Sequence, residues 1–571
     1  MHKKMIASAL ALTLLLSGCQ SNEKPADTQV QEDQNSQTEV QTYEGAVNIA
    51  LSDDEIKVDG TAISEDPAQA VYKANDIVYY EEGKDFTYGE GTEEDAHSAE
   101  EAAAHTVVHI TEPGTYALSG SLSLGQVAID LGEEAEEDPN AVVTLVLNGV
   151  DITCEVAPAV IFYNVYECGE ADEETATYTV DTSAAGANVL IADGTENNID
   201  GSYVARIYKD GTQELNEAGT EVVDAKKLHK YDAAFYSKMS MNVNGEDEGS
   251  GILNIKADNE GLDSELHLTL NGGIVNIESG NDGINTNEDY VSVTTINGGE
   301  VNIYVNGATG EGDGIDSNGW LVINGGTVRT SACAISGDAG IDSDMGIYLN
   351  GGTVQAGGNM LDAIAGGEQT YAVFNFAQRV SGGSEIILKD TDGKAVYTCA
   401  PENDFSILIL AGDFLQPGDY TLWQDETQLA GSTGGNMGGF GGGMMKPEGF
   451  DPEDMPEPEL PDGMERPEGG FDRKDIITNE DGTITLPDGT TIDPKDMPQR
   501  GQEGGMPQPE LPEGEMPQMP SPDGSGENRT PGGGRGHGGS GGNMDGTALS
   551  PTFTIAEGGN MFSAITAYEE A

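Results

Sequence analysis

The chain has 571 residues and a formal net charge of −76, from 101 acidic and 25 basic side chains. A surface this acidic repels nucleic acid and anionic lipid, so we exclude both as direct partners. Cations and uncharged ligands remain as the expected partners of the folded part, which we expect to be a monomer.

The first residues have the features of a bacterial export signal. Lys3 and Lys4 precede an apolar run that is too short to span a bilayer, and the run ends in Leu-Ser-Gly-Cys at Cys19. This ending resembles a lipobox, so we interpret 1–18 as a lipoprotein signal peptide. We expect Cys19 to be lipidated, with the protein on the extracellular face of the cell membrane and touching the membrane only through this anchor. The alternative is an ordinary signal peptide with an incidental cysteine.

Residues 19–45 are polar and predict a flexible tether. Four further cysteines, Cys154, Cys168, Cys333 and Cys399, show no CxxC spacing. A disulfide between Cys154 and Cys168 is one interpretation, and buried free thiols are the other.

The phrase Asn-Gly-Gly recurs at Asn271, Asn297, Asn324 and Asn350, in steps of 26, 27 and 26 residues. Each period alternates apolar and polar residues as short strands do, and no segment of it has a helical pattern of ten or more residues. Such a period with about three strands is typical of one coil of a parallel β-helix. We therefore predict an all-β protein with a single-stranded parallel β-helix over 46–370. Glycine supplies positive φ at its corners, and the asparagines can stack amide on amide.

Oxygen-bearing side chains recur at fixed places in each period, after "EGLDSE", "DGINTN", "DGIDSN" and "AGIDSD" are aligned. Equivalent residues of neighbouring coils lie about 4.7–4.9 Å apart, where two carboxylates repel by about 3–4 kcal/mol at an effective dielectric near 20. Calcium bonds oxygen and relieves this repulsion. The alternative is that these residues only serve as turn formers. The candidate calcium ligands are Glu260, Asp263, Asp282, Asn285, Asn287, Asp313, Asp316, Asn318, Asp338, Asp342 and Asp344.

The outward-facing positions of the same strands predict a carbohydrate-binding surface. Trp320 and Tyr348 fall on adjacent coils and form a candidate aromatic platform, because aromatic faces stack on sugar rings. Side chains that can hydrogen-bond a sugar occupy a neighbouring outward position: Asn276, Asn302, Arg329 and Gln355. The alternative is that the two aromatic residues are ordinary surface side chains.

Beyond the repeat, 371–430 is β-rich, with a hairpin turn predicted at Asp390 to Lys394. Residues 431–547 are rich in Gly, Pro, Met, Glu and Asp and predict a long disordered insertion that contains a local hairpin over 484–492. Strand pattern returns over 548–571, so we expect terminal strands there.

Several phrases in order resemble the bacterial extracellular carbohydrate-binding β-helix family, which is kin to calcium-dependent pectate lyases. They are "GTYALSGSL", "VTLVLNGVDI", "LIADGTENNI", "DAAFYSKMSMNVNG", "NDGINTNEDYVSV" and "GDGIDSNGWLVINGG". The resemblance implies a right-handed β-helix with a β-rich C-terminal cap, bound calcium, and affinity for cellulose or pectic polysaccharide without lyase activity. The chain departs from the family pattern at "KMSMNVNG", which lacks an acidic pair, and in its long insertion.

Two other functions stay open. A calcium-dependent polysaccharide lyase needs a base beside a carboxylate-binding cation, and Lys256 and Arg329 are the candidates for that base. They do not form a constellation in the sequence, so we expect a protein that binds polysaccharide and is not an enzyme. The third interpretation is a structural surface protein without catalytic activity.

Overall fold

The structure is a computed structural model that describes residues 43–169, 171–216, 218–434, 477–478, 484–485, 491–492 and 549–569. Cys19, the signal segment, most of the tether and most of the 431–547 insertion lie outside these residues. The chain divides into two compact units, of which one comprises 1–443 with 541–571 and the other 444–540. Within the described residues, no helix is long and apolar enough to cross a membrane.

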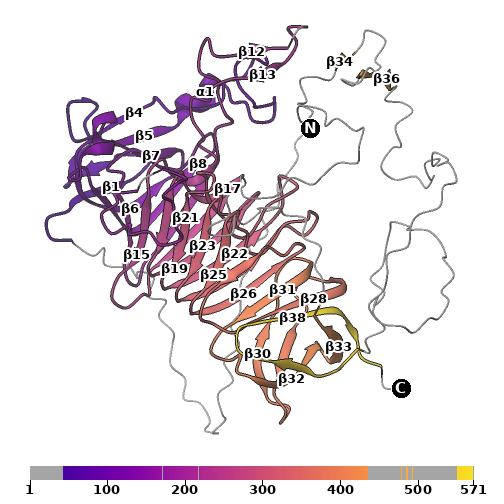
Figure 1. Cartoon of the computed structure of the whole chain (residues 1–571). Coiled ribbons are helices and arrows are strands. Elements are labelled where there is room, and N and C mark those ends of the chain that lie inside the picture. Colours follow the sequence, from indigo (N-terminus) through magenta and orange to yellow (C-terminus); the bar gives the residue numbers. More distant parts are fainter. Residues whose placement is uncertain are drawn as a thin grey trace, which may run out of the picture. The chain divides into compact units, whose positions relative to one another are not determined.

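The first unit is built from three ladders of parallel strands, to which each successive turn of the chain adds a strand (Figure 1). The first ladder runs β1 (Val47–Leu51), β6 (Gly114–Leu122), β8 (Val143–Cys154), β10 (Ala187–Ile191), β15 (Met241–Gly245), β18 (His267–Leu270), β21 (Val293–Ile296), β23 (Trp320–Ile323), β25 (Gly346–Leu349) and β27 (Ile364–Gly366). The second ladder starts at the end of β8 and runs β11 (Glu196–Gly201), β16 (Ile252–Ala257), β19 (Ile274–Ser279), β22 (Glu300–Val305), β24 (Thr327–Ser331) and β26 (Thr353–Gly358).

The third ladder has fewer strands than the first and carries the acidic residues. It runs β5 (Thr106–Ile110), β7 (Gly125–Asp130), β9 (Val160–Asn164), β14 (Ala233–Ser237), β17 (Glu260–Ser264) and β20 (Ile284–Thr286). Backbone bonds continue it beyond β20, since Asp316 N donates to Ile284 O at 2.8 Å and Asp342 N to Ile315 O at 2.7 Å. Parallel strands need a crossover between them, and here the other two ladders supply it.

The interior between the ladders is filled by columns of aliphatic side chains, as the alternation of apolar and polar residues predicts. Leu262, Ile284, Ile315 and Ile341 are completely buried, and so are the inward residues of the first ladder. Each such side chain contributes about 1.5–3 kcal/mol on burial. The period-two alternation therefore identified the core correctly.

The Asn-Gly-Gly corners stack as predicted. The side-chain amide of Asn297 donates to Asn271 Oδ1 at 2.9 Å, Asn324 to Asn297 at 2.9 Å and Asn350 to Asn324 at 2.8 Å. Glycine is required at the last corner position, where Gly299 has φ +81° and an added Cβ would lie 2.5 Å from a backbone oxygen.

Smaller elements precede and interrupt the ladders. They are β2 (Lys57–Val58), β3 (Thr61–Ala62), β4 (Val71–Ala74), the helix α1 (Ala99–Ala104), the 3-10 turn η1 (Glu133–Glu137), β12 (Glu214–Leu215) and β13 (Val222–Asp224). The short helix α1 begins with a capping box, in which Ser98 Oγ accepts from Glu101 N and the Glu101 carboxylate accepts from Ser98 N.

A mostly antiparallel sheet with its own core follows the ladders. Its strands are β28 (Tyr371–Val380), β29 (Ile386–Lys389), β30 (Ala395–Cys399), β31 (Phe405–Ala411), β32 (Gly418–Gln424), β33 (Thr427–Thr433), β37 (Phe553–Ile555) and β38 (Gly559–Ala567). β31 joins it to β26 of the second ladder. The predicted hairpin between β29 and β30 is confirmed, and Asp390 Oδ1 accepts from Asp392 N and Lys394 N in its turn.

In the second unit, β34 (Ile477–Thr478), β35 (Ile484–Thr485) and β36 (Thr491–Ile492) form a small antiparallel sheet. The hairpin predicted over 484–492 is therefore confirmed. The four cysteines of the described residues are free thiols, which excludes a bond between Cys154 and Cys168.

Candidate functional site

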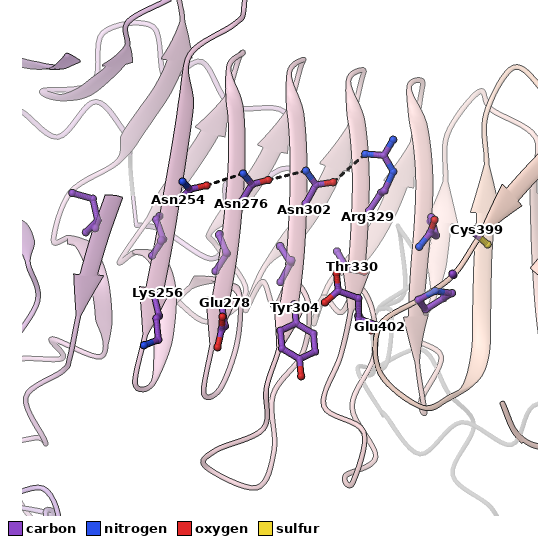
Figure 2. A pocket seen from close by; sticks show the side chains of 18 of the residues that line it. Asn254, Lys256, Asn276, Glu278, Asn302, Tyr304, Arg329, Thr330, Cys399 and Glu402 are labelled. Carbon is purple, nitrogen blue, oxygen red and sulfur yellow. Dashed lines mark hydrogen bonds between the residues drawn. The ribbon is translucent and has the colours of Figure 1, made fainter. Parts of the chain in front are cut away.

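A groove of about 880 Å³ runs across the second ladder, and we call it the amide groove (Figure 2). Its floor consists of side chains that alternate outward from β11, β16, β19, β22, β24 and β26, and residues 398–402 form one wall. Because each coil contributes the same outward positions, the groove presents a similar set of groups at every strand spacing, about 4.8 Å.

A row of side-chain amides forms the central line of this groove. Asn276 Nδ2 donates to Asn254 Oδ1 at 2.8 Å and Asn302 Nδ2 to Asn276 Oδ1 at 2.9 Å. Arg329 Nη1 then donates to Asn302 Oδ1 at 3.0 Å, as Figure 2 shows. Each amide oxygen in the row accepts one bond and has two lone pairs. The row is therefore held rigid while acceptor capacity remains for a ligand.

Charged side chains along the groove are paired with neighbours. Arg329 Nη1 lies 2.6 Å from Glu300 Oε1, and Lys256 Nζ lies 3.9 Å from Asp200 Oδ2. The fourth predicted hydrogen-bonding residue, Gln355, lines the groove but is buried and accepts from Tyr397 Oη at 3.4 Å. The structure thus brings Asn276, Asn302, Arg329 and Gln355 into one groove.

Both candidate bases of the lyase interpretation line the same groove, but the predicted calcium ligands are not beside them. None of the eleven predicted calcium ligands lines the amide groove. A β-elimination needs base and cation on the same sugar unit. Arg329 and Lys256 are each also engaged by a carboxylate, so the groove has the features of a binding surface.

The predicted calcium ligands lie on the outer side of the third ladder and its continuation, which we call the carboxylate row. Asp263 pairs in register with Asn285. Asn287 Nδ2 donates to Asp263 Oδ1 at 2.8 Å, and Asn285 Nδ2 donates to Glu260 Oε1 at 3.2 Å. These four side chains are all buried.

The row continues over the following coils. Asp313 N donates to Asp282 Oδ1 at 2.6 Å, and Gly312 N donates to Asp338 Oδ2 at 2.6 Å. Asn318 Nδ2 reaches the backbone oxygen of Asn287 at 3.0 Å. Asp316 and Asp342 are half-buried, whereas Asp344 is exposed at the end of the row.

Burial and mutual repulsion make these carboxyl groups hard to ionise. Burial, with neighbouring carboxylates, raises the pKa of Asp282, Asp316 and Asp342 to about 7. The same causes raise the pKa of Glu260 and Asp263 well above the ordinary range. Near neutral pH the row therefore needs either protons or a cation.

Unpartnered oxygens test whether the row fits a cation. Glu260 Oε2, Asp263 Oδ2, Asn285 Oδ1, Asp342 Oδ1 and Asp362 Oδ2 are buried and have no hydrogen-bond partner. A buried acceptor without a donor is costly, and carboxylate and amide oxygens are the kinds of ligand that coordinate calcium. Within the described residues, however, no three His, Cys, Asp or Glu side chains form a group that could hold a metal ion. The donor set fits calcium only when amide or backbone oxygens complete the coordination.

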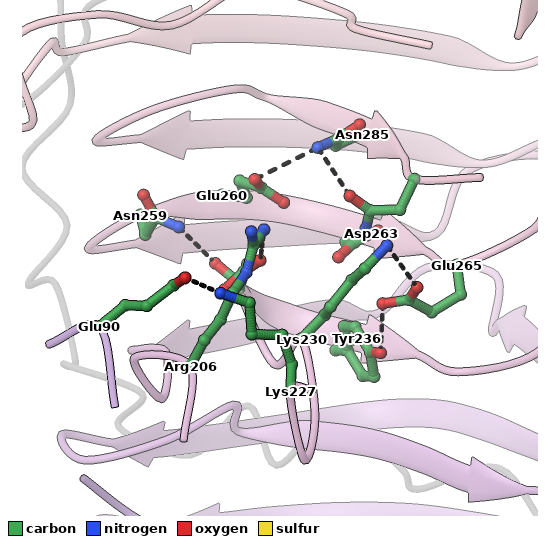
Figure 3. A network of polar contacts seen from close by, with 12 residues as sticks. Glu90, Arg206, Lys227, Lys230, Tyr236, Asn259, Glu260, Asp263, Glu265 and Asn285 are labelled. Atoms are coloured by element: carbon green, nitrogen blue, oxygen red, sulfur yellow. Dashed lines mark hydrogen bonds and ion pairs between the residues drawn. The ribbon is translucent and has the colours of Figure 1, made fainter. Parts of the chain in front are cut away.

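Cationic side chains cover the start of the row (Figure 3). Arg206 Nη2 lies 2.8 Å from Asp232 Oδ2, and Lys230 Nζ lies 3.4 Å from Glu265 Oε2. The backbone oxygen of Asp232 accepts from Glu260 N at 3.2 Å. At the start of the row, protein cations therefore pair with acidic side chains next to Glu260 and Asp263.

The raised pKa values predict how the calcium-free protein responds to pH. An unfolded aspartate has a pKa of about 3.9, whereas Asp282, Asp316 and Asp342 titrate near 7 in the folded state. The folded state then binds more protons, so its stability is full below about pH 4 and falls as pH rises through 7. Calcium-free protein should melt at a higher temperature at pH 5 than at pH 8. Asp316→Asn should reduce this difference, and Asp390→Asn should not.

The aromatic platform was predicted wrongly. Trp320 is only 8% exposed, because it packs with Val293, Val322 and part of the segment 171–182. Tyr348 stacks on Tyr178 of that segment, with ring centroids 4.1 Å apart. The alternation identified the outward face correctly, but the segment covers it. The two aromatics also belong to the first ladder and the amide row to the second, so they do not line one groove.

Sequence reasoning missed five side chains of these sites. Asn198 and Asn254 extend the amide row before the first residue that we singled out, since Asn254 Nδ2 donates to Asn198 Oδ1 at 2.8 Å, and Asp362 extends the carboxylate row one coil further. All three could have been found by continuing the columns in each direction. The repeat could not predict that Arg206 and Lys230 lie over the first carboxylates, because these two residues belong to an irregular segment between coils.

The fold and groove define an all-β module whose parallel ladders present an extended polar surface suited to a polymeric ligand. The family described as carbohydrate-binding domain-containing protein matches residues 104–389, which is half of the chain. The chain belongs to this family, and carbohydrate binding is the activity that the family description gives. A comparison with curated proteins found no match.

Among solved structures, a polysaccharide lyase-like protein from C. thermocellum, studied as a gadolinium derivative, is similar to this chain. The two are 19% identical, and the alignment covers 53% of this chain and 90% of that one, with a TM-score of 0.30. A likeness at this TM-score supports no argument about fold or activity.

Proposed function

We propose that this protein binds polysaccharide along the amide groove. The observation that carries the proposal is the hydrogen-bonded row Asn254–Asn276–Asn302–Arg329, which repeats one polar group per coil across a groove of about 880 Å³. A polysaccharide repeats its hydroxyl groups along its length, and amides can both donate to and accept from hydroxyls. Because the amides are already held in place, little side-chain entropy is lost on binding.

The charges of the groove favour a neutral glycan of the cellulose type over a pectic one. Asp200, Glu278, Glu300 and Glu402 line or adjoin the groove, against the cations Lys256 and Arg329. An acidic polymer meets a net negative surface there, and the whole chain carries −76. A pectic chain would need a bridging cation, whereas a neutral glucan needs none.

We further propose that the three ladders wind as a right-handed, single-stranded parallel β-helix and that calcium on the carboxylate row stabilises it. The strand register at steps of 26–27 residues supports the first part. The unpartnered buried oxygens support the second. Calcium would be held by Asp263, Asn285 and Asp316 with neighbouring amide and backbone oxygens, and its role is structural.

The location of the protein is also a proposal, because Cys19 lies outside the described residues. A lipid on Cys19 would place the groove outside the cell, where insoluble glycans are met. Cys19→Ala should release the protein from the membrane fraction into the medium, which cell fractionation measures. Retention of this variant in the membrane fraction would contradict the anchor.

The binding proposal is tested by pelleting pure protein with insoluble cellulose. Asn302→Ala breaks the amide row and should weaken binding about tenfold, since it removes two of the row's hydrogen bonds and leaves others unpaired. Asn297→Ala is the matched control, because Asn297 belongs to an equivalent amide ladder at the exposed corners. Equal binding by the two variants would contradict the groove.

The same samples test the lyase alternative. Polygalacturonate incubated with protein and calcium should produce no ultraviolet absorbance of unsaturated uronate, because the candidate bases are paired and the carboxylate row is not in the groove. If absorbance rises and is abolished by Arg329→Ala or Lys256→Ala, the lyase interpretation replaces the proposal of binding without cleavage. Neither pelleting nor absorbance would favour a purely structural protein.

A further inference from the structure

A second cavity, of about 450 Å³, lies over the third ladder and away from the amide groove. Its lining includes Tyr163, His229, Lys230, Tyr231, Lys238 and Glu265, and we call it the lysine–tyrosine pocket. Figure 3 shows three of its lining residues, Lys230, Tyr236 and Glu265, close to one another. No residue lines both this pocket and the amide groove.

His229 is the unusual residue of the pocket. Its side chain is 8% exposed, and neither ring nitrogen has a hydrogen-bond partner in the structure. Burial and the nearby Arg206 lower the pKa of His229 to about 4, so the ring is neutral at pH 7. A neutral imidazole offers one donor and one acceptor. A buried polar group without partners is costly unless a ligand supplies them.

The cations of the pocket are already neutralised. Lys230 Nζ lies 3.4 Å from Glu265 Oε2, and Lys238 Nζ lies 2.6 Å from Glu136 Oε1. Lys227 is paired with Glu90. No uncompensated positive charge is left for an anion, in a chain whose net charge is strongly negative. Each pair instead places a donor beside an acceptor, which is the complement of a hydroxyl group.

Aromatic rings supply the remaining wall. The Tyr231 ring is 5.4 Å from Tyr163 and 5.4 Å from Tyr236, both nearly edge-on, and it stacks on His229 at 4.3 Å. Tyr163 and Tyr231 are only partly buried, so part of each ring borders the cavity. Apolar ring faces next to donor–acceptor pairs match the two kinds of surface that a sugar ring has.

We propose that the lysine–tyrosine pocket binds a single neutral sugar unit, such as the end of a glycan chain, as a site separate from the amide groove. Paired charges exclude an anionic sugar as the preferred ligand, and the pocket volume suits a small molecule and not a long polymer. The protein would then have two modes of recognition, one along a chain and one at a unit of it.

The test uses the intact folded protein and titrates it with neutral methyl glycosides of glucose, galactose, mannose and xylose by calorimetry or ligand-observed NMR. At least one should bind in the millimolar range, and galacturonate should bind more weakly. Lys230→Met should weaken binding about tenfold. Lys226→Met is the matched control, because Lys226 is exposed and does not line the pocket.

His229→Phe separates function from folding. It replaces a buried unpaired ring by an apolar one, so it should keep or raise the melting temperature while binding of the glycoside is lost. Asn302→Ala should leave glycoside binding unchanged, so failure of this site and failure of the amide groove are distinguishable. The proposal is overturned if no neutral glycoside binds, if galacturonate binds best, or if Lys230→Met and His229→Phe bind normally.

Discussion

Calcium should raise the melting temperature of the protein, and the size of the effect should depend on the carboxylate row. An ion that binds only the native state stabilises it by about 2.7 kcal/mol when its concentration is 100 times its Kd. Extracellular calcium sites have Kd values of about 10⁻⁴–10⁻³ M, so millimolar calcium should suffice. The measurement is a melting curve in chelator and in calcium at one pH.

The variant Asp316→Asn tests this prediction, because it should raise the melting temperature without calcium and reduce the rise that calcium causes. Asp316 is repelled by Asp282 and Asp344, so losing its charge should stabilise the calcium-free protein and reduce the response to calcium. Asp390→Asn is the control, because Asp390 serves a hairpin turn away from the row. Identical melting curves with and without calcium would refute the proposed ion, and an equal loss of response in both variants would place it elsewhere.

Phe562→Ala should be among the most destabilising single changes in the chain. Phe562 is 1% exposed in the second core, 5.5 Å from the Phe374 ring and 5.1 Å from the Phe553 ring. Removing a buried phenylalanine typically costs about 3–5 kcal/mol, from lost transfer energy and the cavity left behind. Chemical denaturation measures the change in the free energy of unfolding.

The Phe562→Ala experiment also tests whether the final strands of the chain belong to the folded core. Its strand β38 pairs in parallel with β28, although more than 170 residues separate them in sequence. Tyr568→Ala is the control, since Tyr568 is 37% exposed near the same end and should change stability by less than about 0.5 kcal/mol. A small effect of Phe562→Ala would mean that the final strands are not part of the folded core.

The repeat in the sequence was enough to predict the period of the strands and the rows of polar side chains. A period of 26–27 residues with alternating side chains determines which residues point inward, and Leu270, Ile296 and Ile323, which immediately precede the Asn-Gly-Gly corners, are buried accordingly. The same period determines that Asn276 stacks on Asn302, because equivalent residues of neighbouring coils must be neighbours. The turn at Asp390 was visible from local residue chemistry alone.

The candidate sites were predicted only in part, because periodicity says which way a side chain points and not what lies over it. The segment 171–182 covers Trp320, and the excursion that carries Arg206 and Lys230 covers the first carboxylates. Neither segment repeats, so no column of the alignment reports its position.

The sequence by itself therefore determined the period of the parallel strands, the core that they enclose, and the amide and carboxylate rows. Only the tertiary structure decided which outward rows stay open, namely the one with Asn276 and not the one with Trp320. It also assembled the pocket around His229 from residues of different coils. The physical reason is that a strand's alternation is local, whereas exposure depends on contacts between segments far apart in the chain.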